Sequence, residues 1–228
     1  RVERECDDSQ PRTPFMTSST LTTLPLFPLG SVLYPGGLLP LRIFEVRYLH
    51  MISEAHKAGS PFGVVALTQG SEVRVAGAEA ERFATIGTLA QIRRFEALQP
   101  ALLHIECTGT QRFRVHNSAQ QKNGLWTAEV ERLADDVTLP VPEDLAHVAQ
   151  ALKRLVDTLE ARKTAEGRDD VRLPIAEPYR FDDCGWVANR WCELLPMQTE
   201  LKQRLMELES PLMRLELVAD LLQRHSIA

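Results

Sequence analysis

The sequence predicts an α+β protein in which a β-rich N-terminal half with one early helix precedes an α-helical half. Up to residue 140 the apolar residues fall mostly in short runs separated by glycine, proline and Asn-Gly, which is typical of strands and tight turns. Beyond Pro140 they recur at helical spacing over longer segments. We therefore expect a β-rich subdomain at 20–140, an α-helical bundle at 141–228, and a disordered leader or expression remnant at 1–19.

The first half contains one helical segment among several extended ones. Apolar residues recur at helical spacing over Phe44–Lys57, and Gly59 can end that helix. Proline within Leu24–Gly30 predicts an edge strand, because proline cannot donate to a β-ladder. Asn123-Gly124 predicts a hairpin. Further strands are expected at Leu38–Ile43, Phe62–Leu67, Thr85–Phe95, Leu102–Val115 and Leu125–Leu133. Together they predict a mostly antiparallel sheet or barrel.

The second half is divided by residues that begin or end helices. Pro142 and the acidic residues after it favour a helix start. Charged residues with Gly167 and two prolines indicate a long loop over 161–180. Asp182 or Asp183 can cap the following helix. Two more helices are expected, over about 199–208 and from Ser210-Pro211 onward.

Charge and cysteine content exclude several classes of protein. The net charge is -5, and residues 20–141 carry 11 basic and 11 acidic groups, so strong nucleic-acid binding is not expected. The 4 cysteines include no Cys-x-x-Cys pair and no secretory signal precedes them, which favours reduced thiols in the cytoplasm. No apolar run approaches the roughly 18 residues of a membrane span.

Motifs of the common catalytic machineries are absent from the sequence. It has no phosphate-binding Gly-x-x-x-x-Gly-Lys loop, no Gly-x-Ser-x-Gly nucleophile turn and no His-Glu-x-x-His zinc helix. The 6 histidines are scattered without ligand spacing. We therefore expect no enzyme activity, no cofactor and no metal. A catalytic cluster that assembles only in the fold stays open, since such groups meet only in space.

Residues 24–48 read Leu-Pro-Leu-Phe-Pro-Leu-Gly-Ser-Val-Leu-Tyr-Pro-Gly-Gly-Leu-Leu-Pro-Leu-Arg-Ile-Phe-Glu-Val-Arg-Tyr. This string resembles the opening motif of the Lon protease substrate-binding domain family. Later segments keep the family order, namely Gly87–Ile92, Gly109–Arg114, Trp126–Val130, Leu195-Pro196, Lys202 and Arg214–Glu216. The resemblance covers about residues 22–226, and its opening motif is the most specific part.

The resemblance implies an N-terminal PUA-like β-barrel followed by a C-terminal α-helical bundle, in a bacterial cytoplasmic protein. In Lon this region precedes an ATPase and a peptidase, and the sequence stops at Ala228 without either. The resemblance therefore implies a non-catalytic protein- or peptide-binding module. Expected partners are unfolded or partly folded polypeptides and a separate protease or chaperone, without a membrane.

Two groups of residues are candidates for peptide contact. Phe27, Val32, Leu33 and Tyr34 lie in a segment rich in proline and glycine that we expect near the surface, where apolar residues can form a recognition patch. The alternative is that they close the barrel end. Arg47 and Tyr48 could flank a peptide groove, although we favour a packing role in which they fix the helix to the barrel.

Four arginines form the best basic cluster of the sequence. Two tryptophans lie in one predicted helix. Arg112 and Arg114 share a strand face because side chains alternate. A solvated face is the favoured interpretation; the alternative is an RNA-binding PUA-like barrel. Trp186 and Trp191 lie on different helix faces, and we expect at least one in the core. The arginine cluster consists of Arg93, Arg94, Arg112 and Arg114.

Overall fold

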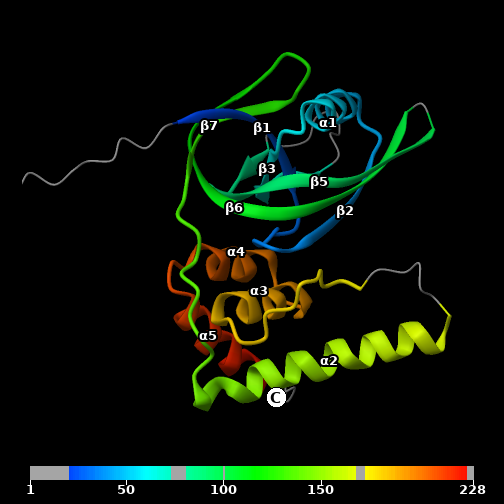
Figure 1. Ribbon diagram of the computed structural model, residues 1–228. Coiled ribbons are helices and arrows are strands. Elements are labelled where there is room, and N and C mark those ends of the chain that lie inside the picture. Colours follow the sequence, from blue (N-terminus) through cyan, green and yellow to red (C-terminus); the bar gives the residue numbers. More distant parts are fainter. Residues whose placement is uncertain (1–20, 73–80, 100, 168–172, 225–228) are drawn as a thin grey trace, which may run out of the picture.

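The structure, a computed structural model, describes residues 21–72, 81–99, 101–167 and 173–224. It confirms the α+β class: a strand-built half lies against a group of helices, and the chain passes from one to the other once, through residues 133–142 (Figure 1). The leader expected at 1–19 falls outside the described residues. The expected boundary near residue 140 stays a prediction, although the last strand ends and the first helix begins on either side of it.

The strands and the early helix agree with the predicted segments. Gly59 ends the helix in the left-handed conformation, with φ of 62°. The strand expected over Leu102–Val115 continues to Gln120, and a two-residue strand at Arg82–Phe83 was not predicted. The elements of this half are β1 (Thr22–Leu29), β2 (Leu38–Ile43), α1 (Val46–Ala58), β3 (Phe62–Gln69), β4 (Arg82–Phe83), β5 (Ile86–Gln99), β6 (Leu102–Gln120) and β7 (Trp126–Arg132).

Five strands pair in a closed ring, in the order β1, β7, β6, β5 and β3. The ring closes because β3 pairs in parallel with β1, while β2 adds to β6 and β4 to β3. The prediction that Leu24–Gly30 is an edge strand is therefore wrong. Pro25 pairs only with β7 and Pro28 only with β3, so neither proline needs a ladder N–H on both sides.

Two helices of the second half begin at the predicted capping residues. The side chain of Asp183 caps its helix by accepting the N–H of Gly185 at 3.0 Å, and Ser210 does the same for Met213 at 3.2 Å. The predicted loop begins later than expected, because the first α-helix continues to Ala165. The elements are the 3-10 turn η1 (Glu143–Leu145), α2 (Ala146–Ala165), α3 (Cys184–Leu194), α4 (Thr199–Glu207) and α5 (Pro211–Arg224).

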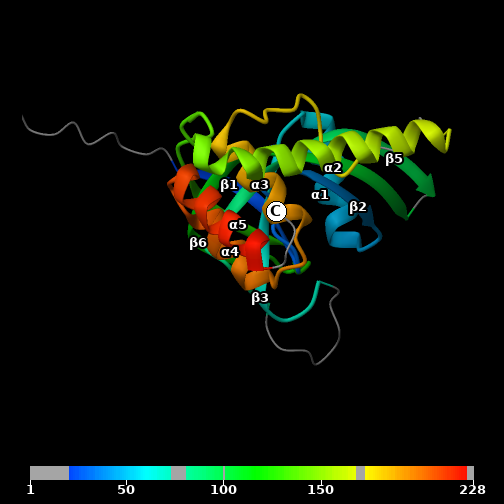
Figure 2. The same ribbon diagram turned by 90° about the horizontal axis from the view of Figure 1, so that it is seen from below.

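Each half has its own apolar core, and one barrel residue enters the core of the other half. Helix α1 covers one end of the ring through Tyr48, Met51 and Ile52. Tyr34, in the turn between β1 and β2, is fully buried among the side chains of the helical core. Seen from below, α2 runs across the other helices toward the side of the β5–β6 hairpin (Figure 2).

A buried ion cluster anchors the connection between the halves. Asp136, in the connecting segment, accepts from Arg112 of β6 at 2.8 Å and from Arg214 of α5 at 2.5 Å. Arg112 also donates to the backbone oxygens of Met206, in the last turn of α4, and of Leu208, just beyond its end. Both arginines are almost fully buried. One carboxylate therefore holds a barrel strand, the connection and the last helix together.

We expect Asp136→Asn to lower the free energy of unfolding by about 3 kcal/mol, because it leaves two buried guanidinium groups without their countercharge. Chemical denaturation measures this. The matched control is Asp157→Asn, which removes an exposed ion pair with Lys153 on α2 and should cost less than about 1 kcal/mol. Equal losses in the two variants would contradict a special role for the buried cluster.

Candidate functional site

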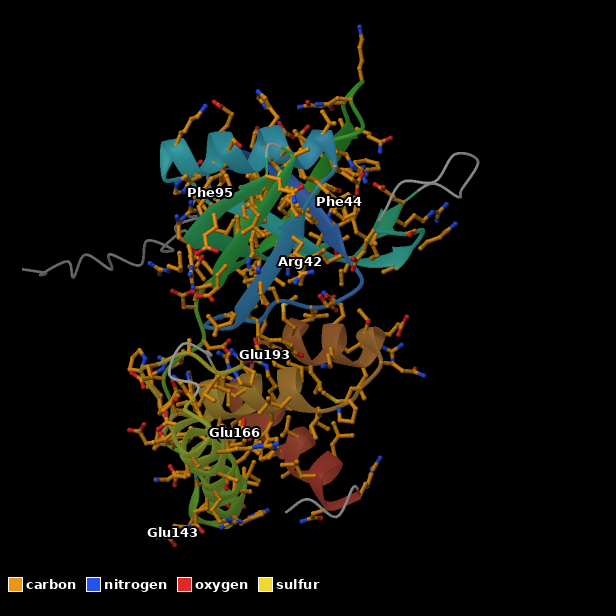
Figure 3. All side chains as sticks on the ribbon, turned by 90° about the vertical axis from the view of Figure 1, so that its right-hand side faces the viewer. Arg42, Phe44, Phe95, Glu143, Glu166 and Glu193 are labelled. Carbon is orange, nitrogen blue, oxygen red and sulfur yellow. The ribbon has the colours of Figure 1, made fainter. Side chains whose placement is uncertain are left out.

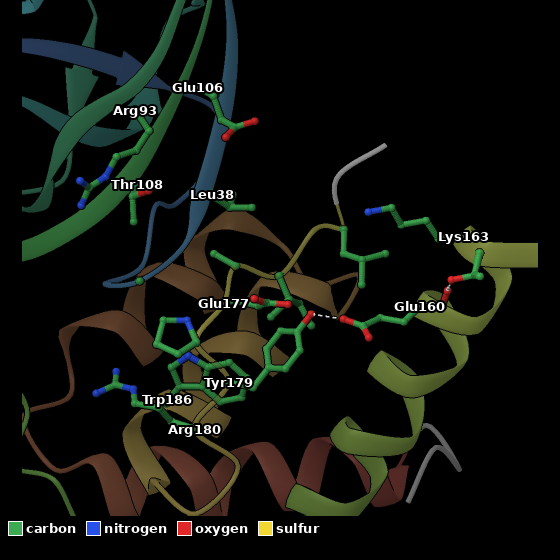
Figure 4. Close-up of a pocket in the computed structure, with 16 residues that line it drawn as sticks. Leu38, Arg93, Glu106, Thr108, Glu160, Lys163, Glu177, Tyr179, Arg180 and Trp186 are labelled. Carbon is green, nitrogen blue, oxygen red and sulfur yellow. Dashed lines mark hydrogen bonds between the residues drawn. The ribbon is translucent and has the colours of Figure 1, made fainter. Parts of the chain in front are cut away.

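A cavity of about 990 Å³ lies between the barrel and the helices (Figure 4). Its volume is at the upper end of the range of roughly 300–1,000 Å³ seen for ligand pockets. One wall is formed by the outer face of the barrel, and the other by the C-terminal part of α2 and the segment 173–180. The side chains that matter below are Leu38, Arg93, Lys163, Ile175, Tyr179 and Trp186. We call this cavity the cleft.

Aromatic side chains line the helical wall of the cleft. Tyr179 and Trp186 belong to the lining, and Phe181, outside it, contacts both of their rings; the centroids within this group lie 5.3–6.2 Å apart. The hydroxyl of Tyr179 donates to Glu160 of α2 at 2.7 Å, which ties the segment before α3 to that helix (Figure 4). Ile175 is buried beside them. This wall offers apolar and aromatic surface with polar groups at its border, which is the usual composition of a ligand pocket.

Charged groups border the cleft on both sides. Arg180 pairs with Asp183 at 3.4 Å, and Glu160 is engaged by Tyr179. Arg93 on β5 and Lys163 on α2 form no ion pair or hydrogen bond within the described part of the chain, and the same is true of Glu177. The border therefore keeps two unpaired cations and one unpaired carboxylate.

The turn between β1 and β2 sets the distance between the two walls. Arg190 of α3 donates to the backbone oxygen of Pro35 at 2.8 Å and also to that of Gly36. The hydroxyl of Tyr34 donates to the backbone oxygen of Lys202 on α4 at 2.5 Å. Gly36 itself lines the cleft. We call these contacts of residues 34–36 with α3 and α4 the junction.

Gly109 lets this turn approach the barrel. The turn and β6 exchange hydrogen bonds, from Gly36 N–H to the Gly109 oxygen at 2.8 Å and from Gly109 N–H to the Gly37 oxygen at 2.9 Å. A Cβ at Gly109 would lie 2.2 Å from the backbone oxygen of Tyr34. The Gly109–Arg114 segment of the sequence thus supplies the contact for the turn, the buried Arg112 and the core residue Phe113.

A partly buried acidic residue lies at the junction. Glu193 pairs with Arg190 at 3.1 Å and lies between the barrel and the helices (Figure 3). Burial raises the pKa of Glu193 to about 7, against the opposing effects of Arg190 and Lys202. Burial likewise lowers the pKa of Lys202, whose ammonium donates to the Glu193 backbone oxygen at 3.0 Å. Proton binding near neutral pH is therefore coupled to the contact between the halves.

Most residues predicted to contact peptide are buried. Phe27, Leu33, Tyr34, Arg47 and Tyr48 each have less than 9% of their surface exposed, and Val32 is half-buried. The expectation that the 27–34 segment lies at the surface is therefore wrong for three of its four residues. Phe27 and Leu33 are buried in the core of the barrel, and Tyr34 is buried in the core of the helical half.

Arg47 and Tyr48 have the packing role that the sequence favoured. The Tyr48 ring stacks on Phe27 with centroids 4.0 Å apart. The Arg47 guanidinium lies over the Tyr48 ring and pairs with Glu45 at 3.0 Å and Glu81 at 3.2 Å. Exposed apolar side chains lie nearby instead. Phe44, just before α1, is 55% exposed (Figure 3), and Val46, the first residue of α1, is 81% exposed.

The four arginines do not form one basic surface. Arg93 faces the cleft, Arg94 pairs with Glu96 at 2.5 Å, and Arg114 is exposed. Arg112 and Arg114 share one face of β6, as expected, with the core residue Phe113 on the other face, but Arg112 is buried in the ion cluster, so the expectation of a solvated face is wrong for Arg112. The burial differs along this face because the helical half covers β6 at Arg112 and leaves Arg114 exposed.

At least one of Trp186 and Trp191 was expected in the core, and both are buried there. Some residues of the cleft, in contrast, were not predicted from the sequence. Trp186 and Trp191 are each 4% exposed, and the Trp191 indole donates to the Val148 oxygen at 3.1 Å. Tyr179 and Lys163 were passed over because their segment reads as a charged loop. The signal was available in Tyr179 and Phe181, two aromatic residues within a polar stretch.

Several further observations bear on the class of protein. No group of three or more histidine, cysteine or acidic side chains among the described residues could hold a metal ion. Of the helices in the described ranges, none is long and apolar enough to cross a bilayer. Cys107, Cys184 and Cys192 are buried free thiols.

The fold and the cleft define a two-part α+β domain whose cavity lies where barrel and helices meet. The family of ATP-dependent protease La (LON) substrate-binding domains matches residues 23–224, and the chain belongs to this family. A crystal structure of a Lon N-terminal domain protein from Xanthomonas campestris is 30% identical, with a TM-score of 0.66. That match covers 87% of this chain and 98% of the other.

More distant relatives share the fold or parts of the sequence. The N-terminal domain of a Lon protease from the Mycobacterium avium complex matches 87% of this chain and 97% of its own, with a TM-score of 0.55 at 16% identity, which shows the fold alone. A Lon protease from Anaeromyxobacter dehalogenans is 27% identical over 88% of this chain. Protein cereblon of Danio rerio is 31% identical over 54%. The chain spans only 23% and 28% of these two relatives.

The pKa of Glu193 predicts how pH changes stability. Because the native pKa of about 7 lies above the ordinary value of 4.5, the native state holds a proton between these values that the unfolded state has released. This contribution to stability is present at low pH and is lost as pH rises through about 7. Glu193→Gln should remove it, so the difference in unfolding free energy between the two proteins should change by up to about 3 kcal/mol from about pH 5 to about pH 8.

Denaturation of both proteins across that pH range measures the difference. Taking the difference cancels the contribution of the histidines, which both proteins share. A constant difference would show that Glu193 does not titrate at the junction.

Proposed function

We propose that this chain is a non-catalytic module that binds unfolded or partly folded polypeptide, and that an extended segment of the client lies in the cleft. The single observation that carries the proposal is the cavity at the contact of the two halves, with its aromatic wall. Membership of a family of substrate-binding domains supports polypeptide as the ligand.

The shape and composition of the cleft support this ligand class. The outer barrel face carries Leu38 at the start of β2, opposite Ile175 and Trp186. Apolar side chains of an unfolded segment would gain burial there, at about 25 cal/mol for each Å² removed from water. Folded proteins keep such side chains inside, so the cleft would distinguish unfolded from folded polypeptide.

We further propose that the module acts in the cytoplasm and passes its clients to a separate protease or chaperone. The free thiols support a reducing compartment. The described lining residues of the cavity include no serine, cysteine or histidine, so they offer no nucleophile and base of the serine- or cysteine-hydrolase kind. An RNA-binding role loses its main support because Arg112 is buried.

A binding measurement tests the proposal. The full chain should bind a permanently unfolded model protein, and Leu38→Asp should weaken this binding about tenfold, because a charge would face the aromatic wall. Fluorescence anisotropy with the labelled unfolded protein measures the affinity. Circular dichroism checks that the variant is folded.

The control is Leu98→Asp, which places the same charge on an exposed side chain of the hairpin arm, outside the cleft lining. This variant should bind within about twofold of the unaltered chain. If no unfolded protein binds, the proposed function is wrong; if both variants lose binding equally, the cleft is not the site.

Incubation of the chain with casein, with and without ATP, tests the non-catalytic part of the proposal. Electrophoresis should show no cleavage product under either condition. Cleavage by the purified chain would overturn this part of the proposal, and its loss or persistence in Leu38→Asp would show whether the catalytic group lies in the cleft or elsewhere.

A further inference from the structure

The two unpaired cations of the cleft come from opposite walls. Arg93 belongs to β5 of the barrel and Lys163 to the C-terminal part of α2 (Figure 4). Neither has an ion-pair or hydrogen-bond partner in the part of the chain that the structure describes. Some other surface cations of the molecule are paired, among them Arg94, Lys153 and Arg162.

The carboxylates of the cleft do not neutralise these cations. Glu160 accepts from the Tyr179 hydroxyl, and Glu106 is engaged in other contacts. Glu177 is the one lining carboxylate of the described residues without a partner. Arg180, the third lining cation, keeps a long pair with Asp183 at 3.4 Å. Among the described lining residues there is therefore more unengaged positive than negative charge, next to the aromatic wall.

From this arrangement we infer that the cleft selects polypeptide segments in which acidic side chains stand beside apolar ones. The inference rests on the proposed function and names the class of client. The apolar side chains lie against Tyr179 and Ile175, and carboxylates on either side of them reach Arg93 and Lys163. Opposite charges in a partly desolvated cleft attract more strongly than on an open surface.

The net charge of the whole chain makes the opposite prediction. At -5 it repels acidic ligands and attracts basic ones over long range. A preference for acidic peptides can therefore arise only from a local site. The sign of the charge preference thus separates recognition in the cleft from nonspecific attraction.

A series of labelled peptides tests the inference with the full chain. The peptides share the same leucine and phenylalanine positions and differ only in the residues between them, which are aspartate, serine or lysine. We expect the aspartate peptide to bind about tenfold more tightly than the lysine peptide, with the serine peptide between them. The preference should weaken as salt is added, because these side chains remain partly accessible to ions.

Charge reversal assigns the preference to the two cations. The double variant Arg93→Glu/Lys163→Glu should bind the lysine peptide more tightly than the aspartate peptide. The matched control is Arg94→Glu/Lys153→Glu, which makes the same change in net charge on the same strand and helix but outside the cleft lining. The control should keep the preference of the unaltered chain.

The outcomes separate this inference from the proposed function. If none of the peptides binds, the proposed function fails. If all of them bind equally, or if both double variants shift the preference equally, the cleft binds polypeptide without the charge selection inferred here. Circular dichroism of each variant confirms that a lost preference does not reflect unfolding.

Discussion

Buried guanidinium groups at the contact between barrel and helices constrain the rest of this structure. Arg190 donates to Pro35 and Gly36, and Arg112 and Arg214 share the carboxylate of Asp136. A buried charge without partners is costly, so these contacts form together only when the two halves adopt one relative position. That position also fixes the width of the cleft, because the turn held by Arg190 forms part of its lining.

The same constraint explains the sequence motif that identifies the family. The Leu24–Tyr48 string contains β1, which is one of the strands of the barrel ring. It also contains the turn that carries Tyr34 into the helical core and the β2 strand beside the cleft. The later segment Gly109–Arg114 supplies the glycine on which the turn rests. The motif residues therefore mainly stabilise the contact between the two halves rather than contact a ligand. The cleft forms because this contact holds the halves in one relative position.

Local patterns in the sequence were sufficient to predict most helices and strands, but they did not predict which residues form the cleft. Helix caps and turn glycines act within a few residues, so Asp183 and Gly59 could be assigned directly. The cleft combines β2, β5, β6, α2 and the segment before α3, which meet only in space. Arg112 was expected at the surface because charged residues rarely lie in cores, and its partners Asp136 and Met206 are far away in sequence.

The central claim is that polypeptide is held between the halves rather than on the exposed apolar end of α1, where Phe44 and Val46 lie. Hydrogen-exchange mass spectrometry of the chain with and without a bound unfolded polypeptide tests it most directly. Slower exchange in β2 and over residues 173–181, with α1 unchanged, is the predicted result. Slower exchange confined to residues 44–50 would contradict the account and move the binding surface to the far side of the barrel from the helices.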